Sequence, residues 1–288
     1  MPYLYLLTAS LTCGSSSVLG GAFNRRHATQ KNTAILYDLF MIASACALWW
    51  CVYLADFSFE VRVLGYSALF AIGFSLGAFC LIQALKYGPT PLTALFNSLS
   101  LIVTTVWGFG FWGETPDALV IIGLALVVIS IYFCLCAGKK TDKPFSWKWL
   151  ALALLSMLGN AACAIVQRTQ QQHFSGAHGS MLMAFSMAFS LAVFALAYPF
   201  LDKPDHKIVS KQSFYFPALA GACNMLLNFC VVKLATSALA PSFIYPVISV
   251  GGLTMVTLVT LLVFKEKLSW QRWAGVAIGA VAIVLLSI

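Results

Sequence analysis

Residues 229–286 read FCVVKLATSALAPSFIYPVISVGGLTMVTLVTLLVFKEKLSWQRWAGVAIGAVAIVLL. The stretch contains the end of one apolar segment, a short polar break, an apolar segment that begins at Pro241, a charged turn and a final apolar segment with spaced glycines. Apolar segments of about 20 residues between short polar turns are typical of membrane-spanning helices. The stretch therefore predicts consecutive transmembrane helices.

Residues 79–133 repeat this pattern as FCLIQALKYGPTPLTALFNSLSLIVTTVWGFGFWGETPDALVIIGLALVVISIYF. The corresponding positions are Phe79 and Phe229, Pro91 and Pro241, Glu114 and Glu266, and Gly123 and Gly275. The first two pairs share one offset, and the last two share an offset that is slightly longer. A self-match of this length indicates two copies of one membrane unit.

The composition of the chain excludes a soluble globular protein. The sequence is 61% hydrophobic and 9% charged, whereas soluble domains carry about 25% charged residues. The net charge of +8 comes from Lys and Arg in short loops between apolar segments, which is typical of loops that set membrane orientation. We therefore expect membrane lipid, and not nucleic acid, as the surroundings of this chain.

The cysteines and histidines favour neither a metal site nor an enzyme. All nine cysteines lie within apolar segments, and no C-x-x-C spacing is matched by a histidine pair. The four histidines fall in loops or at the ends of apolar segments. We therefore expect no catalytic residue, no metal ligand and no cofactor, and we interpret the cysteines as small apolar packing residues.

Ten apolar segments are long enough to be transmembrane helices. They cover approximately residues 2–23, 33–55, 63–87, 91–112, 117–137, 148–172, 178–201, 212–235, 240–264 and 269–288. The expected organisation is a first repeat over 1–138, a cytoplasmic linker over 139–147 and a second repeat over 148–288. Because each repeat contains five helices, an odd number, the second repeat must have the opposite orientation in the membrane. The sequence thus predicts an all-α integral membrane protein of ten helices in two inverted five-helix repeats, with a substrate site near the midplane between them.

The positive charges predict the orientation. All but three of the 17 Lys and Arg residues fall in loops on one side of this arrangement, and the exceptions are Arg62, Arg168 and Lys233. The positive-inside rule places the basic loops in the cytoplasm and both termini outside. The first apolar segment has no charged leader before it, so we interpret it as a retained helix. A multi-pass protein of the plasma or inner membrane is expected.

The paired pattern resembles the drug/metabolite transporter superfamily, specifically its EamA-like ten-helix members. The matching residues are Gly113-Glu114-Thr115-Pro116 and Lys265-Glu266-Lys267-Leu268-Ser269, each followed by a glycine-spaced segment that includes Gly123 or Gly275. The resemblance covers essentially the whole chain and implies a transporter fold. It does not define the substrate, because the family moves amino acids, nucleotide sugars, phosphorylated sugars, choline and drugs. The two glutamates have a simpler interpretation as helix-capping residues.

Polar side chains inside apolar segments are costly to bury without partners. They lie on the helices that line the central cavity in the proteins that this chain resembles. The predicted substrate-binding residues are Ser15, Ser16, Gln83, Asn97, Ser98, Asn160, Gln167, Asn224, Asn228, Tyr245 and Ser249. For the serines, a bond to the backbone of their own helix is the alternative. The side-chain amides of the asparagines need more partners than one backbone carbonyl supplies.

Small residues and prolines suggest where helices pack or bend. Pro246, Gly251 and Gly252 form a predicted gate, with a tolerated kink as the alternative. Two G-x-x-x-G patterns, at 73–77 and 275–279, predict close helix packing within the chain or, alternatively, a homodimer interface.

We expect a secondary transporter that moves a small polar or zwitterionic, amino-acid-like metabolite by alternating access. One alternative is an exchanger of anionic or phosphorylated metabolites that uses Lys86, Arg168 or Lys233. The other is a membrane scaffold or sensor that transports nothing. The small-molecule substrate is the only ligand that the transporter interpretation requires.

Overall fold

The computed structural model describes residues 2–26, 33–87, 90–113, 115, 117–135, 146–198, 211–262 and 270–287, and within these ranges the chain is helical without strands. The helices are α1 (Pro2–Arg26), α2 (Thr33–Ala55), α3 (Val61–Tyr87), α4 (Thr90–Phe111), α5 (Ala118–Leu135), α6 (Trp147–His173), α7 (Gly179–Ala197), α8 (Lys211–Ala235), α9 (Pro241–Leu262) and α10 (Trp270–Ser287). The prediction of an all-α chain of ten helices is confirmed.

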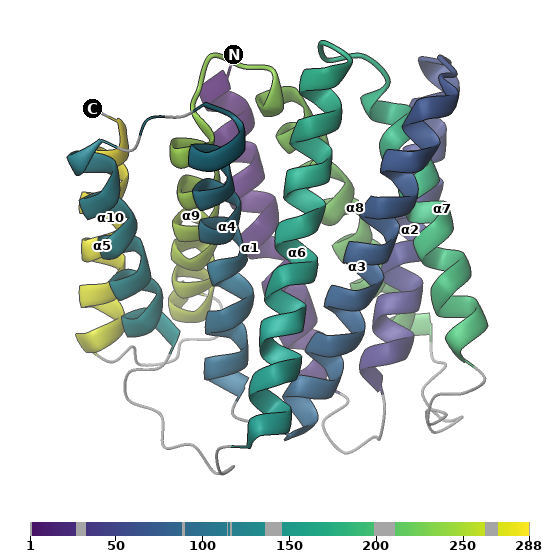
Figure 1. Cartoon of the computed structure of the whole chain (residues 1–288). Coiled ribbons are helices and arrows are strands. Elements are labelled where there is room, and N and C mark those ends of the chain that lie inside the picture. The colour runs from purple at the N-terminus through teal and green to yellow at the C-terminus, as the bar shows by residue number, and fades with distance from the viewer. Residues whose placement is uncertain are drawn as a thin grey trace.

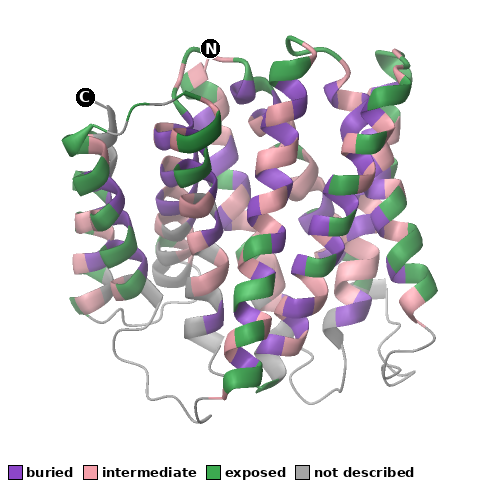
Figure 2. Cartoon of the chain, in the orientation of Figure 1, coloured by how far each residue is buried: buried purple, intermediate pink, exposed green. Residues whose placement is uncertain are grey.

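Five of the described helices are long and apolar enough to cross a membrane, namely α2, α3, α6, α7 and α8. Shorter apolar segments lie in α4, α5, α9 and α10. Large hydrophobic side chains also remain exposed on the outside of the bundle, as Leu69 and Ile72 do on α3. Figure 2 shows such exposed positions alternating with buried ones along the helices. An exterior of this kind requires lipid as its solvent.

Both termini lie at the same end of the bundle, which we call the terminal side (Figure 1). The helix α1 begins at the terminal side, whereas α6 begins at the opposite end. The two five-helix halves thus run in opposite directions through the bundle. This arrangement agrees with the inverted orientation that the odd number of helices predicts.

The packing of the helices also follows the repeat. Each helix of the first half corresponds to the helix five places later, so that α1 corresponds to α6 and α3 to α8. Under this correspondence most of the packed pairs between the halves have an equivalent packed pair. The equivalent pairs are α3–α6 and α1–α8, α4–α6 and α1–α9, and α3–α7 and α2–α8. The pairs α2–α7, α4–α9 and α5–α10 map onto themselves. Each half therefore packs mainly through contacts with the other half.

Glycines allow the closest of these contacts. A β-carbon added to Gly159 on α6 would lie 2.6 Å from the Gly73 carbonyl oxygen and 2.7 Å from the Gly77 amide nitrogen on α3. At α10, a β-carbon on Gly279 would lie 2.5 Å from Val250 Cγ1 on α9. Both G-x-x-x-G patterns therefore serve packing within the chain.

Some predicted features lie outside the described residues. These are Glu114, Glu266 and residues 139–145 of the expected linker. The repeat boundaries at 138 and 148 and the capping role of the glutamates stay predictions.

Candidate functional site

A cavity with a volume of about 280 Å³ lies between α1, α3, α4, α6, α8 and α9. The lining positions on each helix are three or four residues apart, such as Cys13 and Ser17 on α1 or Asn224 and Asn228 on α8. This spacing keeps side chains on one face of a helix. The cavity is therefore built from single faces of six helices, three from each half of the chain.

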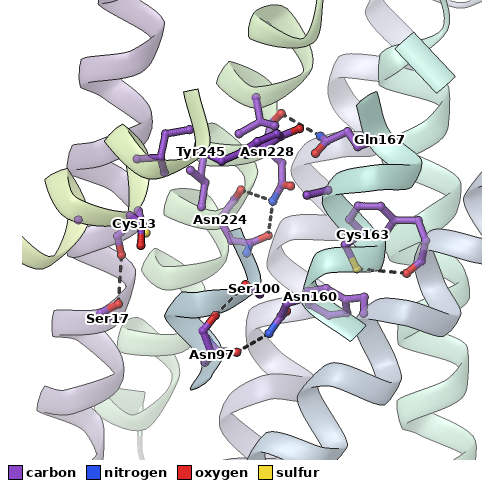
Figure 3. A pocket seen from close by; sticks show the side chains of 18 of the residues that line it. Cys13, Ser17, Asn97, Ser100, Asn160, Cys163, Gln167, Asn224, Asn228 and Tyr245 are labelled. Atoms are coloured by element: carbon purple, nitrogen blue, oxygen red, sulfur yellow. Dashed lines mark hydrogen bonds between the residues drawn. The ribbon is translucent and has the colours of Figure 1, made fainter. Parts of the chain in front are cut away.

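Two amide side chains from different halves meet in this cavity (Figure 3). Asn160 Nδ2 on α6 donates a hydrogen bond to Asn97 Oδ1 on α4. Ser100 Oγ, about one turn further along α4, donates to the Asn97 backbone carbonyl at 2.7 Å. The Asn97–Asn160 bond thus connects the two halves at the cavity wall.

A second group of amides connects α6 with α8 (Figure 3). Gln167 Nε2 donates to the Asn228 backbone carbonyl at 3.2 Å and lies 3.6 Å from Met183 Sδ. Asn228 Nδ2 donates to the Asn224 backbone carbonyl at 2.9 Å and to Asn224 Oδ1 at 3.1 Å. These bonds hold three amide side chains in defined orientations beside the cavity.

The amides keep hydrogen-bonding capacity for a solute. A side-chain amide offers two N–H donors and an oxygen with two lone pairs. Within the described part of the chain, Asn224 Nδ2 and Asn228 Oδ1 have no protein partner. The cavity therefore presents both a donor and an acceptor to whatever occupies it.

Apart from the hydroxyl groups of Ser17 and Ser249, the rest of the lining is mainly apolar or aromatic, and among the described residues it is uncharged. Phe70 and Phe74 on α3 stack with centroids 6.3 Å apart and an interplanar angle of 13°. Tyr245 on α9 is only 2% exposed. Apolar walls with a few oriented polar groups are typical of small-molecule sites.

The structure brings most of the predicted substrate-binding residues together. Those that line the cavity are Asn97, Asn160, Gln167, Asn224, Asn228, Tyr245 and Ser249, and they are joined by Gly252 from the predicted gate. The side chain of Ser98 lies outside the described residues. The substrate-binding role of all these residues stays a prediction.

Three predicted residues, Ser15, Ser16 and Gln83, are placed outside the described lining. The reason for the two serines is helical geometry, because α1 turns Cys13 and Ser17 toward the cavity. At about 3.6 residues per turn, Ser15 projects from the opposite face of α1, and Ser16 projects from the flank of the face that carries Cys13 and Ser17.

The prediction omitted several lining residues, which include Cys13, Ser17, Phe70, Phe74, Ser100 and Cys163. A stricter use of helical spacing finds some of them, because Cys163 lies three residues after Asn160 and Ser100 lies three after Asn97. The two phenylalanines carry no such signal, since the 22 phenylalanines occur in most apolar segments.

The predicted gate lies along the seam between α9 and α1. Pro246 is buried inside the continuous helix α9. A β-carbon on Gly251 would lie 2.6 Å from Ser10 Oγ, and one on Gly252 would lie 3.0 Å from Cys13 Sγ. The glycines therefore bring α9 against α1 beside the cavity, and the gating role stays a prediction.

Two cationic residues of the alternative function, Arg168 and Lys233, lie outside the described lining of the central cavity. Arg168 is 7% exposed, directly follows the cavity residue Gln167, and has its guanidinium carbon 5.2 Å from the Trp112 ring centroid. Lys233 is exposed at the terminal end of α8 and lies outside the described lining. The side chain of Lys86 is outside the described residues.

Comparison with known proteins adds information on family and fold. The model of the EamA-like transporter family matches residues 1–136. Two curated relatives are pseudopaline exporters CntI from Pseudomonas aeruginosa strains UCBPP-PA14 and PAO1, each 28% identical over 129 residues. Each match covers 43% of this chain and 43% of the relative, so the chain spans less than half of the relatives' length.

The fold is similar to that of a solved crystal structure, with a TM-score of 0.76 and 14% sequence identity. The likeness covers 99% of this chain and 95% of the solved chain. At this identity the comparison concerns the arrangement of the helices alone.

Proposed function

Because residues 1–136 belong to the EamA-like transporter family, within the drug/metabolite transporter superfamily, we propose that this multi-pass cell-membrane protein is a secondary transporter. Its substrate is a small polar or zwitterionic metabolite, and amino-acid-like compounds are the leading class. The observation that carries this proposal is the amide-lined, uncharged cavity between the two halves of the described chain. The family and the relatives named as exporters favour transport over catalysis.

The lining supports this substrate class. Asn224 Nδ2 can donate to a carboxylate oxygen, and Asn228 Oδ1 can accept from an ammonium group. The volume of about 280 Å³ suits a compound of amino-acid size. Aromatic walls such as Phe70 and Phe74 would contact an apolar side chain of the same solute.

Alternating access is the mechanism that the inverted halves favour. In this mechanism the two halves exchange contacts around a fixed central site. The Asn97–Asn160 bond and the close α1–α9 seam at Gly251 both join elements of opposite halves. They are therefore the contacts that we expect to change when the cavity opens to the other side.

The experiment combines binding with flux. The purified protein is screened by thermal stability against amino acids, amines, sugar phosphates and nucleosides, because a ligand of the native state raises the melting temperature. Hits are then tested for uptake into proteoliposomes. Asn228→Ala should reduce the affinity for a hit by about tenfold or more, since an unsatisfied polar partner costs about 1–3 kcal/mol.

Gln83→Ala is the matched control, because this half-buried amide lies outside the described lining. It should leave affinity and flux near those of the unchanged protein. Equal losses in both variants, or hits without flux, would count against a transport site at the central cavity. The second outcome would favour the scaffold or sensor alternative.

One observation favours the alternative of an anionic substrate: the buried cation of Arg168 next to the lining residue Gln167. If the substrate is anionic, sugar phosphates should be the stabilising compounds, and Arg168→Gln should remove their binding sharply. If the substrate is zwitterionic, amino acids should be the hits, and Asn224→Ala and Asn228→Ala should have the larger effects.

A further inference from the structure

A second cavity lies at the terminal side of the bundle, apart from the central one. It has a volume of about 270 Å³ and is enclosed by the end of α2, the connection between α6 and α7, and the last turns of α8. The described residues that line it include none that lines the central cavity. The proposed function makes no use of this second cavity.

Two opposite charges face this cavity. Lys233 comes from α8, and its Nζ lies 5.6 Å from the centroid of the Phe229 ring, which also lines the cavity. Asp56 follows the end of α2. In the described structure the two residues form no ion pair with each other. The cavity thus offers a cation and a carboxylate that are not paired with each other, so that each can bind a group of opposite charge on a ligand.

The first residues of α7 contribute a further positive potential. Gly179 and Ser180 line the cavity, and no side-chain hydrogen bond caps this helix at His178. The first N–H groups of a helix have no partner within the helix, and the helix dipole is positive at this end. The start of α7 can therefore support an anionic group that is held by Lys233.

The loop that forms this wall is held in place by specific bonds. His178 adopts a left-handed backbone conformation with φ 58°. Its Nδ1 lies 2.9 Å from Ser58 Oγ, which joins the loop to the end of α2. Gln170 Nε2 donates to the Ala177 carbonyl at 3.1 Å. The wall is thus positioned before any ligand arrives, which lowers the ordering cost of binding.

Trp49, which lies toward the inner end of the cavity by its position on α2, lines the cavity with a buried side chain. Trp49 lies about two turns before Asp56 on α2 and is 1% exposed. Its indole Nε1 has no hydrogen-bond partner in the described part of the chain. An unsatisfied buried donor costs free energy, and an acceptor oxygen that binds at the inner end would remove this cost.

We propose that this cavity is a second binding site, for a small zwitterion that carries a carboxylate and an ammonium group. The carboxylate binds between Lys233, the start of α7 and the Trp49 indole. The ammonium group binds toward Asp56. This site is independent of the transport proposal, because its residues are separate from those of the central cavity.

The test measures equilibrium binding of glycine, acetate and methylamine to the full chain in lipid nanodiscs. The chain carries Asn228→Ala, so that binding at the central cavity is weakened. Glycine should bind saturably, acetate more weakly and methylamine not at all. Lys233→Gln should weaken glycine binding about tenfold, which corresponds to about 1.4 kcal/mol. Trp49→Phe, which removes the indole N–H, should also weaken it.

Arg62→Gln is the matched control, because Arg62 is an exposed cation near the same end of the bundle but outside the cavity. It should leave glycine binding unchanged. Absence of saturable glycine binding, or equal effects of Lys233→Gln and Arg62→Gln, would overturn the proposal. Glycine and acetate of equal affinity would overturn the role of Asp56. If the chain with Asn228 unchanged bound glycine at this site but showed no solute flux, the result would contradict the transport proposal and leave the second binding site standing.

Discussion

Asn160 on α6 donates its side-chain amide hydrogen to the side-chain oxygen of Asn97 on α4, across the boundary between the two halves of the chain. Both residues line the central cavity. One hydrogen bond therefore belongs both to the packing of the halves and to the wall of the candidate site. This double role makes the pair a direct test of how the site is coupled to the fold.

A double-mutant cycle on this pair should show coupling. We expect Asn97→Ala and Asn160→Ala each to lower the affinity for the solute found by the binding screen, while the double variant loses less than the two single losses together. The reason is that either single change already removes the shared bond, and residues in one network couple by about 0.5–3 kcal/mol. The measurement is solute affinity at equilibrium in all four proteins. Strictly additive losses would mean that the two amides act separately.

The glycine contact between α3 and α6 should be essential for stability. Gly159→Ala places a β-carbon 2.6 Å from the Gly73 carbonyl oxygen, where backbone must move. We expect a loss of about 1–3 kcal/mol, the usual range for overpacking, measured as a fall in melting temperature in detergent.

Gly65→Ala, on the partner helix α3, is the control for that change. A β-carbon at this position meets nothing within 4 Å, and alanine favours a helix over glycine by about 1 kcal/mol. This variant should keep or raise the melting temperature. If Gly159→Ala behaved in the same way, the close α3–α6 contact would be wrong.

The glycine pattern of α10 should act within one chain and not between two. Ser130 Oγ on α5 donates to the Gly275 carbonyl at 2.7 Å, and Gly279 faces Val250 on α9. We therefore expect Gly279→Leu to lower the melting temperature strongly. The neighbouring exposed residue Ala280 is the control, and Ala280→Leu should be well tolerated.

The same two variants distinguish packing from dimerisation. Light scattering after size-exclusion chromatography gives the mass of each protein. A stable Gly279→Leu protein that had merely lost a dimer would show that this helix face is an intermolecular interface.

The terminal side should face the outside of the cell, since the sequence predicts that the basic loops lie on the side opposite to both termini. Phe59, in the α2–α3 turn, is 57% exposed. In a chain without other cysteines, Phe59→Cys should react with a membrane-impermeant maleimide added to intact cells. Labelling only after the cells are opened would show that the termini are cytoplasmic.

Hydrophobicity and length by themselves determined the fold class. Ten apolar segments in lipid must satisfy their backbone groups internally, which leaves helices as the solution. The repeat at 79–133 and 229–286, together with the odd number of helices in each half, was enough to predict two inverted halves. These properties depend on local composition and on counting, and both can be read from a linear sequence.

The amides of the cavity could also be predicted, because an asparagine inside an apolar segment needs partners that lipid does not offer. The direction of each side chain could not be predicted in the same way. Ser16 and Ser17 are chemically equivalent in the sequence, and only the rotation of α1 against its neighbours places Ser17 at the cavity.

The tertiary structure alone decided which distant residues meet. The close backbone contact of Gly159 with Gly73 and Gly77 brings α6 against α3. In this position α6 also packs on α4, and Asn160 can therefore bond to Asn97. Lys233 and Asp56 face one cavity because α2 packs on α8. The physical reason is that helix packing depends on the complementary shapes of two helix surfaces. The local sequence pattern of one helix describes its own surface but does not identify the surface that packs against it.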